Sequence, residues 1–181
     1  RWNCDWSSDV CSSDLRAWDW DYIVDKAEHS GVYLKLVLLE KNEWIYNHLD
    51  ANGQPTPNGT NDNFYAAENT AVRRLHEYFW RYALARWGYS TAIHSWELLN
   101  EGDPFNTKHY EAAEAFARYM HTHGAHPHLA TTSLWHSMPV AEFWGNPRYA
   151  SVDYMDTHAN SQWNLYDFWG EKTESPVAFD T

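Results

Sequence analysis

The sequence predicts an α/β fold built on a parallel sheet. Strand-like and helix-like segments alternate about five times along the chain, which is typical of βα units. The segment 32–39 is a continuous β-type run of the kind buried on both faces, and 92–99 is the next predicted strand. An open doubly wound sheet and a (β/α)8 barrel both fit. No G-x-G-x-x-G or G-K-[ST] loop follows any strand, which disfavours a nucleotide-binding sheet.

The regular pattern starts at Arg16 with a predicted helix, which Gly31 can end. Its apolar residues are spaced three and four apart and share one face; they are Trp20, Ile23 and Ala27. The run "VYLKLVLL" at 32–39 predicts the first strand. Residues 47–63 are rich in Asn, Gly and Pro and predict a loop.

Two longer helices are predicted in the middle of the chain. The first runs from about 64 to 87 before Gly88, and one side of it is apolar; the residues on that side are Ala71, Leu75, Tyr78, Phe79 and Tyr82. The strand "AIHSWELL" follows at 92–99. The second helix is closed by Gly124 and has an apolar face made of Tyr110, Ala113, Ala117 and Met120.

The last third of the chain predicts shorter elements. Residues 128–135 and 151–158 predict strands, and residues 140–144 predict a short helix at best. A helical turn or two is expected at 164–172, and one more strand is expected to start at 176–181.

The tract "CDWSSDVCSSDL", residues 4–15, differs from the rest of the chain. It repeats Ser-Ser-Asp, contains both cysteines and has neither helical nor strand periodicity. Back-translated, it closely resembles a widely used sequencing adapter, so we interpret 1–15 as non-native and 16–181 as the native part. The alternative is a genuine Ser-rich loop. If the tract is non-native, the cysteines imply no disulfide and no redox compartment.

Composition limits the classes of partner. The formal net charge is -12, which argues against nucleic acid and anionic membrane surfaces, because both need a basic face. No run reaches the roughly 18 apolar residues of a membrane helix. Aromatic residues make up 17% of the chain, which fits either a core rich in large rings or a platform that stacks on the flat faces of sugars.

Polar and aromatic residues end three of the predicted strands. Asn100 and Glu101 follow 92–99, Trp135 and His136 end 128–135, and His158 ends 151–158. In a barrel, function lies where strands end and the loops to the helices begin. These strand ends are therefore the candidate site.

The segment "RYALARWGYSTAIHSWELLNEGDP" resembles the fourth-strand region of retaining glycoside hydrolases with a (β/α)8 barrel, in the cellulase-like clan that includes family 5. The resemblance implies that Glu101 is the general acid/base and that Asn100 holds a sugar hydroxyl. "DTHAN" resembles the sixth-strand His-x-Tyr segment and places His158 beside the catalytic acid, although Asn160 stands where that pattern has Tyr.

"SPVAFDT" resembles the start of the seventh strand, where the nucleophilic Glu follows within a few residues. The chain contains no such Glu before Thr181. The resemblance therefore implies that 16–181 is a partial TIM-barrel catalytic domain, from roughly the third to the early seventh strand, and that the nucleophile is missing from it. Glycans with β linkages are the expected substrates, and no cofactor is expected.

Retaining hydrolysis explains why a buried strand would end in a carboxylate. It needs two carboxyl groups about 5–5.5 Å apart, one acid/base and one nucleophile. The acid must be protonated near neutral pH, so we expect burial or a nearby carboxylate to raise the pKa of Glu101. Asn100 supplies a neutral donor whose hydrogen bond can strengthen as charge develops.

The candidate site residues also have structural interpretations. Glu101 could instead be a helix N-cap or a solvated acid, and Trp135 could be a core residue and not a sugar platform. Trp44 and Glu40, at the end of 32–39, are weaker candidates for the cleft. We interpret His136 as structural. We predict that Glu97 is buried lower in the sheet and paired with a cation.

Two other functions fit parts of the pattern. The 11 His suggest a metal-dependent hydrolase barrel, but no His-x-His pair ends a strand, and no metal ligand is assigned. A non-catalytic carbohydrate-binding barrel would keep the aromatics without needing Asn-Glu at a strand end. The expected partner is a poly- or oligosaccharide, and the expected location is extracellular or at the cell surface rather than cytoplasmic.

Overall fold

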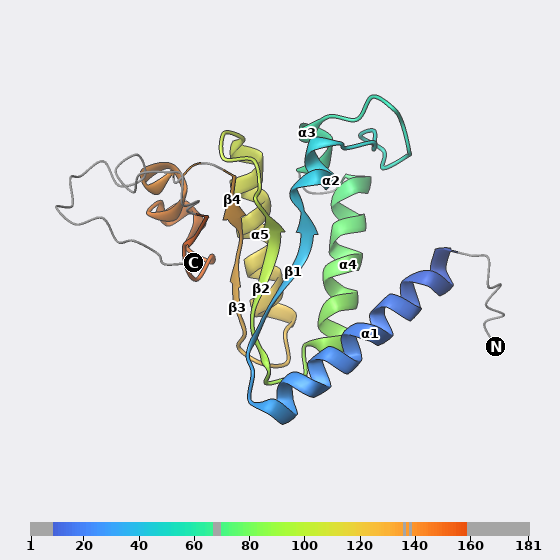
Figure 1. Ribbon diagram of the computed structural model, residues 1–181. Helices are drawn as coiled ribbons and strands as arrows, with labels where there is room; N and C mark the ends of the chain where they lie inside the picture. Colours follow the sequence, from blue (N-terminus) through green and yellow to red (C-terminus); the bar gives the residue numbers. More distant parts are fainter. Residues whose placement is uncertain (1–8, 67–69, 136, 138, 159–181) are drawn as a thin grey trace, which may run out of the picture.

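The chain folds as alternating helices and parallel strands (Figure 1). The computed structural model describes residues 9–66, 70–135, 137 and 139–158. The elements in chain order are α1 (Asp9–Ser30), β1 (Leu34–Glu40), α2 (Lys41–Ile45), α3 (Asn61–Phe64), α4 (Ala71–Trp87), β2 (Ile93–Asn100), α5 (Thr107–His123), β3 (Leu129–Thr131), β4 (Ser133–Leu134), the π-helix η1 (Val140–Trp144), the 3-10 helix η2 (Pro147–Tyr149) and β5 (Asp156–Thr157).

The strands lie side by side in chain order. β1, β2 and β3 form one parallel sheet in that order, and β4 pairs with β5 in parallel. Only Thr132 separates β3 from β4, and a bridge from Gly102 to Leu134 joins the end of β2 to β4. A (β/α)8 barrel has this chain-order arrangement, whereas a doubly wound sheet reverses it at a switch point. The described strands form an α/β parallel sheet, and a partial barrel remains a prediction.

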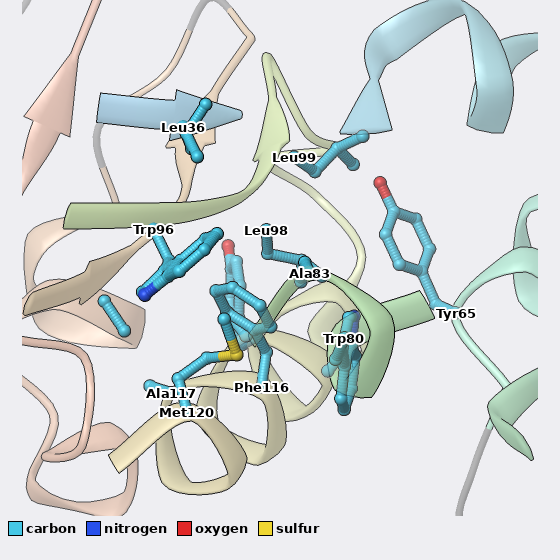
Figure 2. Close-up of a cluster of buried hydrophobic side chains, with 14 of the residues drawn as sticks. Leu36, Tyr65, Trp80, Ala83, Trp96, Leu98, Leu99, Phe116, Ala117 and Met120 are labelled. Atoms are coloured by element: carbon cyan, nitrogen blue, oxygen red, sulfur yellow. The ribbon is translucent and has the colours of Figure 1, made fainter. Parts of the chain in front are cut away.

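The main core lies between β2 and helices α4 and α5 (Figure 2). Trp96 of β2, Phe116 of α5 and Trp80 of α4 are almost completely buried, and the rings of Trp80 and Phe116 meet edge to face at 5.3 Å. Burial of a side chain such as Phe116 stabilises the fold by about 1.5–3 kcal/mol. Glu97 and its neighbours on the other face of β2 are buried too, so β2 is buried on both faces.

The predicted helix ends are confirmed at three glycines. Gly31 follows α1 with a φ of 65°, a left-handed conformation that glycine adopts without strain. Gly88 and Gly124 cap α4 and α5, and their amides donate to Leu84 and Met120 carbonyls at 2.9 Å in both cases. These ends set the direction in which the chain enters β1, β2 and β3.

The predicted start of the helix at about 64–87 is wrong. α4 begins at Ala71, because the Thr70 hydroxyl accepts a hydrogen bond from the Arg73 amide at 3.1 Å and caps the helix there. The separate short helix α3 covers Asn61–Phe64. The first helix also differs, since α1 begins at Asp9, inside the tract 4–15 for which no regular element was expected.

The predicted apolar faces of the first two long helices are partly wrong. On α1, Trp20 and Ile23 are more than 40% exposed, and the buried side chains are those of Ala17, Val24 and Ala27. On α4, the predicted side is exposed or half-buried along its length; its residues are Ala71, Leu75, Tyr78, Phe79 and Tyr82. The face that α4 buries contains Val72, Trp80, Ala83 and Trp87. The face predicted for α5 is confirmed.

Three strand predictions need correction. β1 is not buried on both faces, because Leu36 is buried whereas Val37, on the opposite face, is 41% exposed. The strand at 128–135 divides into β3 and β4 at Thr132. In 151–158 only Asp156–Thr157 forms a strand. The elements predicted at 164–172 and 176–181 lie outside the described residues.

Candidate active site

The carboxyl ends of four parallel strands meet at one edge and bring the predicted site residues together. Asn100 ends β2, Glu101 follows it, and Lys41 follows β1. Trp135 follows β4 and His158 follows β5. Parallel pairing produces this arrangement, because strands that run in the same direction end at the same edge of the sheet.

Glu101 is held in an unusual backbone conformation. Its φ is 57°, and it is the one non-glycine residue in the described part of the chain with a positive φ. Such a conformation costs of order 1–3 kcal/mol and is found mainly at functional sites. Its amide donates to Ser133 Oγ at 2.9 Å, and its carbonyl accepts from Trp44 Nε1 at 3.0 Å. α5 is capped by Asn106, so Glu101 is not an N-cap.

The Glu101 carboxylate is 18% exposed and has two cationic or ionisable partners. Lys41 Nζ forms an ion pair with Oε2, and His158 Nδ1 lies 3.0 Å from Oε1. Burial alone would raise the pKa of Glu101, but the hydrogen bonds and charges of Lys41 and His158 hold that pKa below its usual value. The expected rise in the pKa of Glu101 is therefore wrong for the described site.

Asn100 lies beside Glu101 but its amide is already engaged. Asn100 Nδ2 donates to Glu40 Oε2 at 2.7 Å, and the two residues are register partners across β1 and β2. Glu40 thus lies at the site edge as proposed from the sequence. A sugar hydroxyl that bound to Asn100 would have to share this amide with Glu40 or replace it.

The aromatic candidates form the wall behind the carboxylate. Trp44 and Trp135 pack edge to face with ring centroids 6.0 Å apart, and Lys41 Nζ lies 5.7 Å from the Trp135 ring. Trp44 is only 6% exposed, whereas Trp135 is half-buried. Trp135 is therefore the ring that a ligand could stack on, and Trp44 acts through its hydrogen bond to the Glu101 carbonyl. His136 lies outside the described residues.

The prediction for Glu97 is confirmed. Glu97 is completely buried below the site, and its Oε2 lies 2.6 Å from Lys35 Nζ. Lys35 also pairs with Asp156, at the far side of the described sheets. Glu97 Oε1 accepts a hydrogen bond from Ser133 Oγ at 2.6 Å. A buried charge needs such pairing, because an unpaired one would lose its solvation without compensation.

Sequence reasoning missed two residues of the site, Lys41 and Ser133. Lys41 could have been found, because it directly follows β1 and so lies at the same sheet edge as Glu101. Ser133 could not, because it lies inside the segment 128–135 that was predicted as one uninterrupted strand. Its role depends on the break at Thr132, which the apolar pattern does not reveal.

A groove of about 410 Å³ lies elsewhere, between α4 and α5, and does not include the site. Two arginines on its wall are already paired: Arg118 with Glu114 at 2.8 Å and Arg148 with Glu111 at 2.9 Å. In each pair the glutamate neutralises the arginine. These two arginines therefore give the groove little net positive charge with which to bind a ligand.

Within the described residues no group of three or more His, Cys, Asp or Glu could hold a metal ion. His121, which forms a His-x-His pair with His123 in the last turn of α5, hydrogen-bonds to Asp153 at 2.8 Å. No helix in the described part of the chain is long and apolar enough to cross a membrane.

Comparison with solved structures shows a distant structural likeness. No protein-family model and no curated protein matches the sequence. The chain is similar to the X-ray structure of the endo-beta-1,4-mannanase from Thermotoga petrophila, with a TM-score of 0.48 and 18% sequence identity. The match covers 74% of this chain and 32% of that chain, so the chain spans less than two thirds of that protein's length. This likeness assigns no family.

Proposed function

We propose that the chain is part of a retaining glycoside hydrolase that cleaves β-linked glycans on a (β/α)8 barrel. Glu101 is the general acid/base, and the nucleophile lies outside the 181 residues. The Trp-Glu-x-x-Asn-Glu motif at the end of β2 supports this assignment through its resemblance to the cellulase-like clan. The substrate, a poly- or oligosaccharide, fits an extracellular or cell-surface location.

The observation that carries the proposal is the setting of Glu101. A part-buried carboxylate in a strained left-handed conformation stands at the carboxyl edge of a parallel sheet, between His158 and a tryptophan wall. Strain and charge partners of this kind are usual at catalytic groups. Trp135 offers a half-buried ring beside Lys41, the ion-pair partner of Glu101, and a sugar can stack on that ring.

The lowered pKa of Glu101 fits one half of the proposed reaction cycle. A retaining acid/base residue is protonated in the first step and ionised in the second, when it activates water. Lys41 and His158 favour the ionised form that the second step uses. A nucleophilic carboxylate about 5–5.5 Å away would oppose them and raise the pKa for the first step.

The same observation keeps a second function in view. A Glu101 that stays ionised between Lys41 and His158 suits a barrel that binds carbohydrate through hydrogen bonds without cleaving it. The two functions differ in whether Glu101 has to exchange a proton, so one substitution distinguishes them.

Glu101→Gln is the substitution that tests the proposal, in a longer form of the protein that includes the segment after Thr181. Gln keeps the shape and hydrogen-bonding oxygen of Glu but cannot carry a proton to a leaving group. We expect turnover of β-glucan, β-mannan or xylan to fall at least about 100-fold, as for loss of a general acid, while oligosaccharide binding by calorimetry is retained. Glu111→Gln, the same change on the exposed face of α5, should alter neither. Binding without turnover in the unmutated protein would favour the binding barrel.

A further inference from the structure

Ser133 binds two consecutive amides of the β2–α5 connection. Its Oγ accepts a hydrogen bond from the Glu101 amide at 2.9 Å, and its carbonyl accepts from the Gly102 amide at 2.9 Å. The Gly102 carbonyl in turn accepts from the Trp135 amide at 2.9 Å. The ordinary sheet ladder would leave Glu101 unpaired at this point, because its φ of 57° turns the chain away from the strand.

The hydroxyl proton of Ser133 has only one direction available. Glu97 Oε1 lies 2.6 Å from Ser133 Oγ, and the other Glu97 oxygen is paired with Lys35 Nζ at 2.6 Å. An ionised carboxylate accepts hydrogen bonds and donates none. Ser133 must therefore donate its proton to Glu97, which leaves its lone pairs to accept the Glu101 amide.

We infer that Ser133 is a positioning residue for Glu101, and that the buried Glu97 carboxylate, held by its ion pair with Lys35, fixes the orientation of the Ser133 hydroxyl. Ser133 and Glu97 are both completely buried, so water does not compete for these hydrogen bonds. We call the chain of contacts Lys35–Glu97–Ser133–Glu101 the relay. By holding the backbone of Glu101, the relay positions the carboxylate against Lys41 and His158. Only the effect of this relay on turnover rests on the proposed function; its effect on geometry does not.

Ser95 provides a matched control. It is a completely buried serine of β2, on the same face of that strand as Glu97, and its hydroxyl bonds to Tyr154 OH at 2.8 Å. No contact joins it to Glu101 among the hydrogen bonds of the described residues. Ser95→Ala therefore removes the same oxygen from the same core without breaking the relay.

The test compares Ser133→Ala with Ser95→Ala in the full chain by NMR. In Ser133→Ala we expect the Glu101 amide to exchange about tenfold faster, as for the loss of one buried hydrogen bond. The three-bond coupling that reports φ of Glu101 should change. The pKa of the Glu101 carboxyl group, followed by its carbon-13 shift, should rise as the carboxylate moves away from Lys41 and His158. Ser95→Ala should leave all three signals of Glu101 unchanged. Equal effects of the two variants, or none from Ser133→Ala, would overturn the inference.

Two further measurements cover a Ser133→Ala protein that does not fold. In the unmutated chain the Glu101 amide should exchange as slowly as the Leu99 amide inside β2, and fast exchange would refute the relay directly. Ser133→Thr keeps the hydroxyl and should restore the Glu101 signals.

In a catalytically active longer form, Ser133→Ala should lower kcat with little change in KM. If that form lacks activity, the proposed function fails while the NMR result still decides the relay.

Discussion

Lys41 stabilises the ionised form of Glu101, because its ammonium group forms an ion pair with the carboxylate. Lys41→Met keeps most of the side-chain length and removes the charge. We expect the pKa of Glu101 to rise, since burial would then act against the ionised form with only His158 to oppose it. Carbon-13 NMR titration of the Glu101 carboxyl measures this directly.

Lys108→Met is the matched control for that titration. Lys108 pairs with Asp62 at 3.1 Å on the surface, so its removal should not affect the titration of Glu101. A pKa of Glu101 that stays the same in Lys41→Met would contradict the ion pair. It would also leave His158 as the residue that controls the acid.

Gly102 is fixed by its neighbour His109. A Cβ built at Gly102 would overlap the His109 ring, which is completely buried below the loop. We expect Gly102→Ala to lower the free energy of unfolding by about 1–3 kcal/mol, as for other overpacked sites. Urea unfolding measures the change.

The double variant Gly102→Ala, His109→Ala shows whether the ring is the cause. Removing the ring opens space for the new methyl group, so the two losses should be clearly less than additive. Strictly additive losses would mean that Gly102 is needed for another reason.

At the residue scale, the strand-end rule predicted which candidate residues lie together but not their electrostatics. The rule that function lies at the ends of parallel strands placed Asn100, Glu101, Trp135 and His158 at one edge, and the structure brings them together with Trp44. The pKa of Glu101 could not be predicted in the same way. It depends on where the flexible Lys41 side chain ends, and no periodic pattern encodes that.

One carboxylate of α1 links it to the end of α4. Asp21 accepts hydrogen bonds from Arg86 Nε at 2.9 Å, from Arg86 Nη2 at 2.7 Å and from Trp87 Nε1 at 2.8 Å. We expect Asp21→Asn to lower the free energy of unfolding by about 1 kcal/mol, because the pair is partly exposed. Asp19→Asn, an exposed position on the same helix, should have no effect.

The pH dependence of the Asp21 contribution has a definite sign. The Arg86 hydrogen bonds lower the pKa of Asp21 in the folded chain, so its stabilisation is present above the unfolded pKa of about 3.9. It is lost as the pH falls through the lower folded pKa. Thermal melts from pH 7 to pH 2 should show the difference between Asp21→Asn and the unmutated chain shrinking on acidification, and a constant difference would contradict this account.

At the element scale, the C-terminal ends of the helices were easier to predict than the faces that they bury. Gly31, Gly88 and Gly124 end their helices for local reasons that a short stretch of sequence contains. On α4, residues spaced three and four apart are apolar or aromatic on two sides, and periodicity cannot rank them. Tyr78 keeps its polar tip in water while Trp80 is buried, a choice made by the neighbouring elements.

For the whole molecule, the proposed partial barrel would leave β1 at an open edge of the sheet. Among the described strands β1 pairs only with β2. Val37 in β1 is 41% exposed, and Tyr33, just before β1, is 74% exposed. Open strand edges invite pairing between copies. A barrel buries its strands by closing on itself.

We therefore predict that the 181-residue chain alone is inactive and prone to aggregation. A longer form that adds the missing strands should be monodisperse and should hydrolyse at least one β-linked polysaccharide. Light scattering and a reducing-sugar assay on one panel of polysaccharides compare the two. Robust hydrolysis by the shorter chain would require a nucleophile within 16–181 and would refute the proposed division of roles.

The most direct measurement of the catalytic role of Glu101 compares leaving groups in that longer form. Glu101→Ala should slow hydrolysis of glycosides with poor leaving groups strongly, and of activated aryl glycosides much less, because only the poor leaving groups need protonation. The quantity to measure is the ratio of kcat/KM between the unmutated protein and the variant for each substrate. A ratio that grows with the pKa of the leaving group is the predicted result. Equal losses on both classes of substrate would contradict Glu101 as the acid/base.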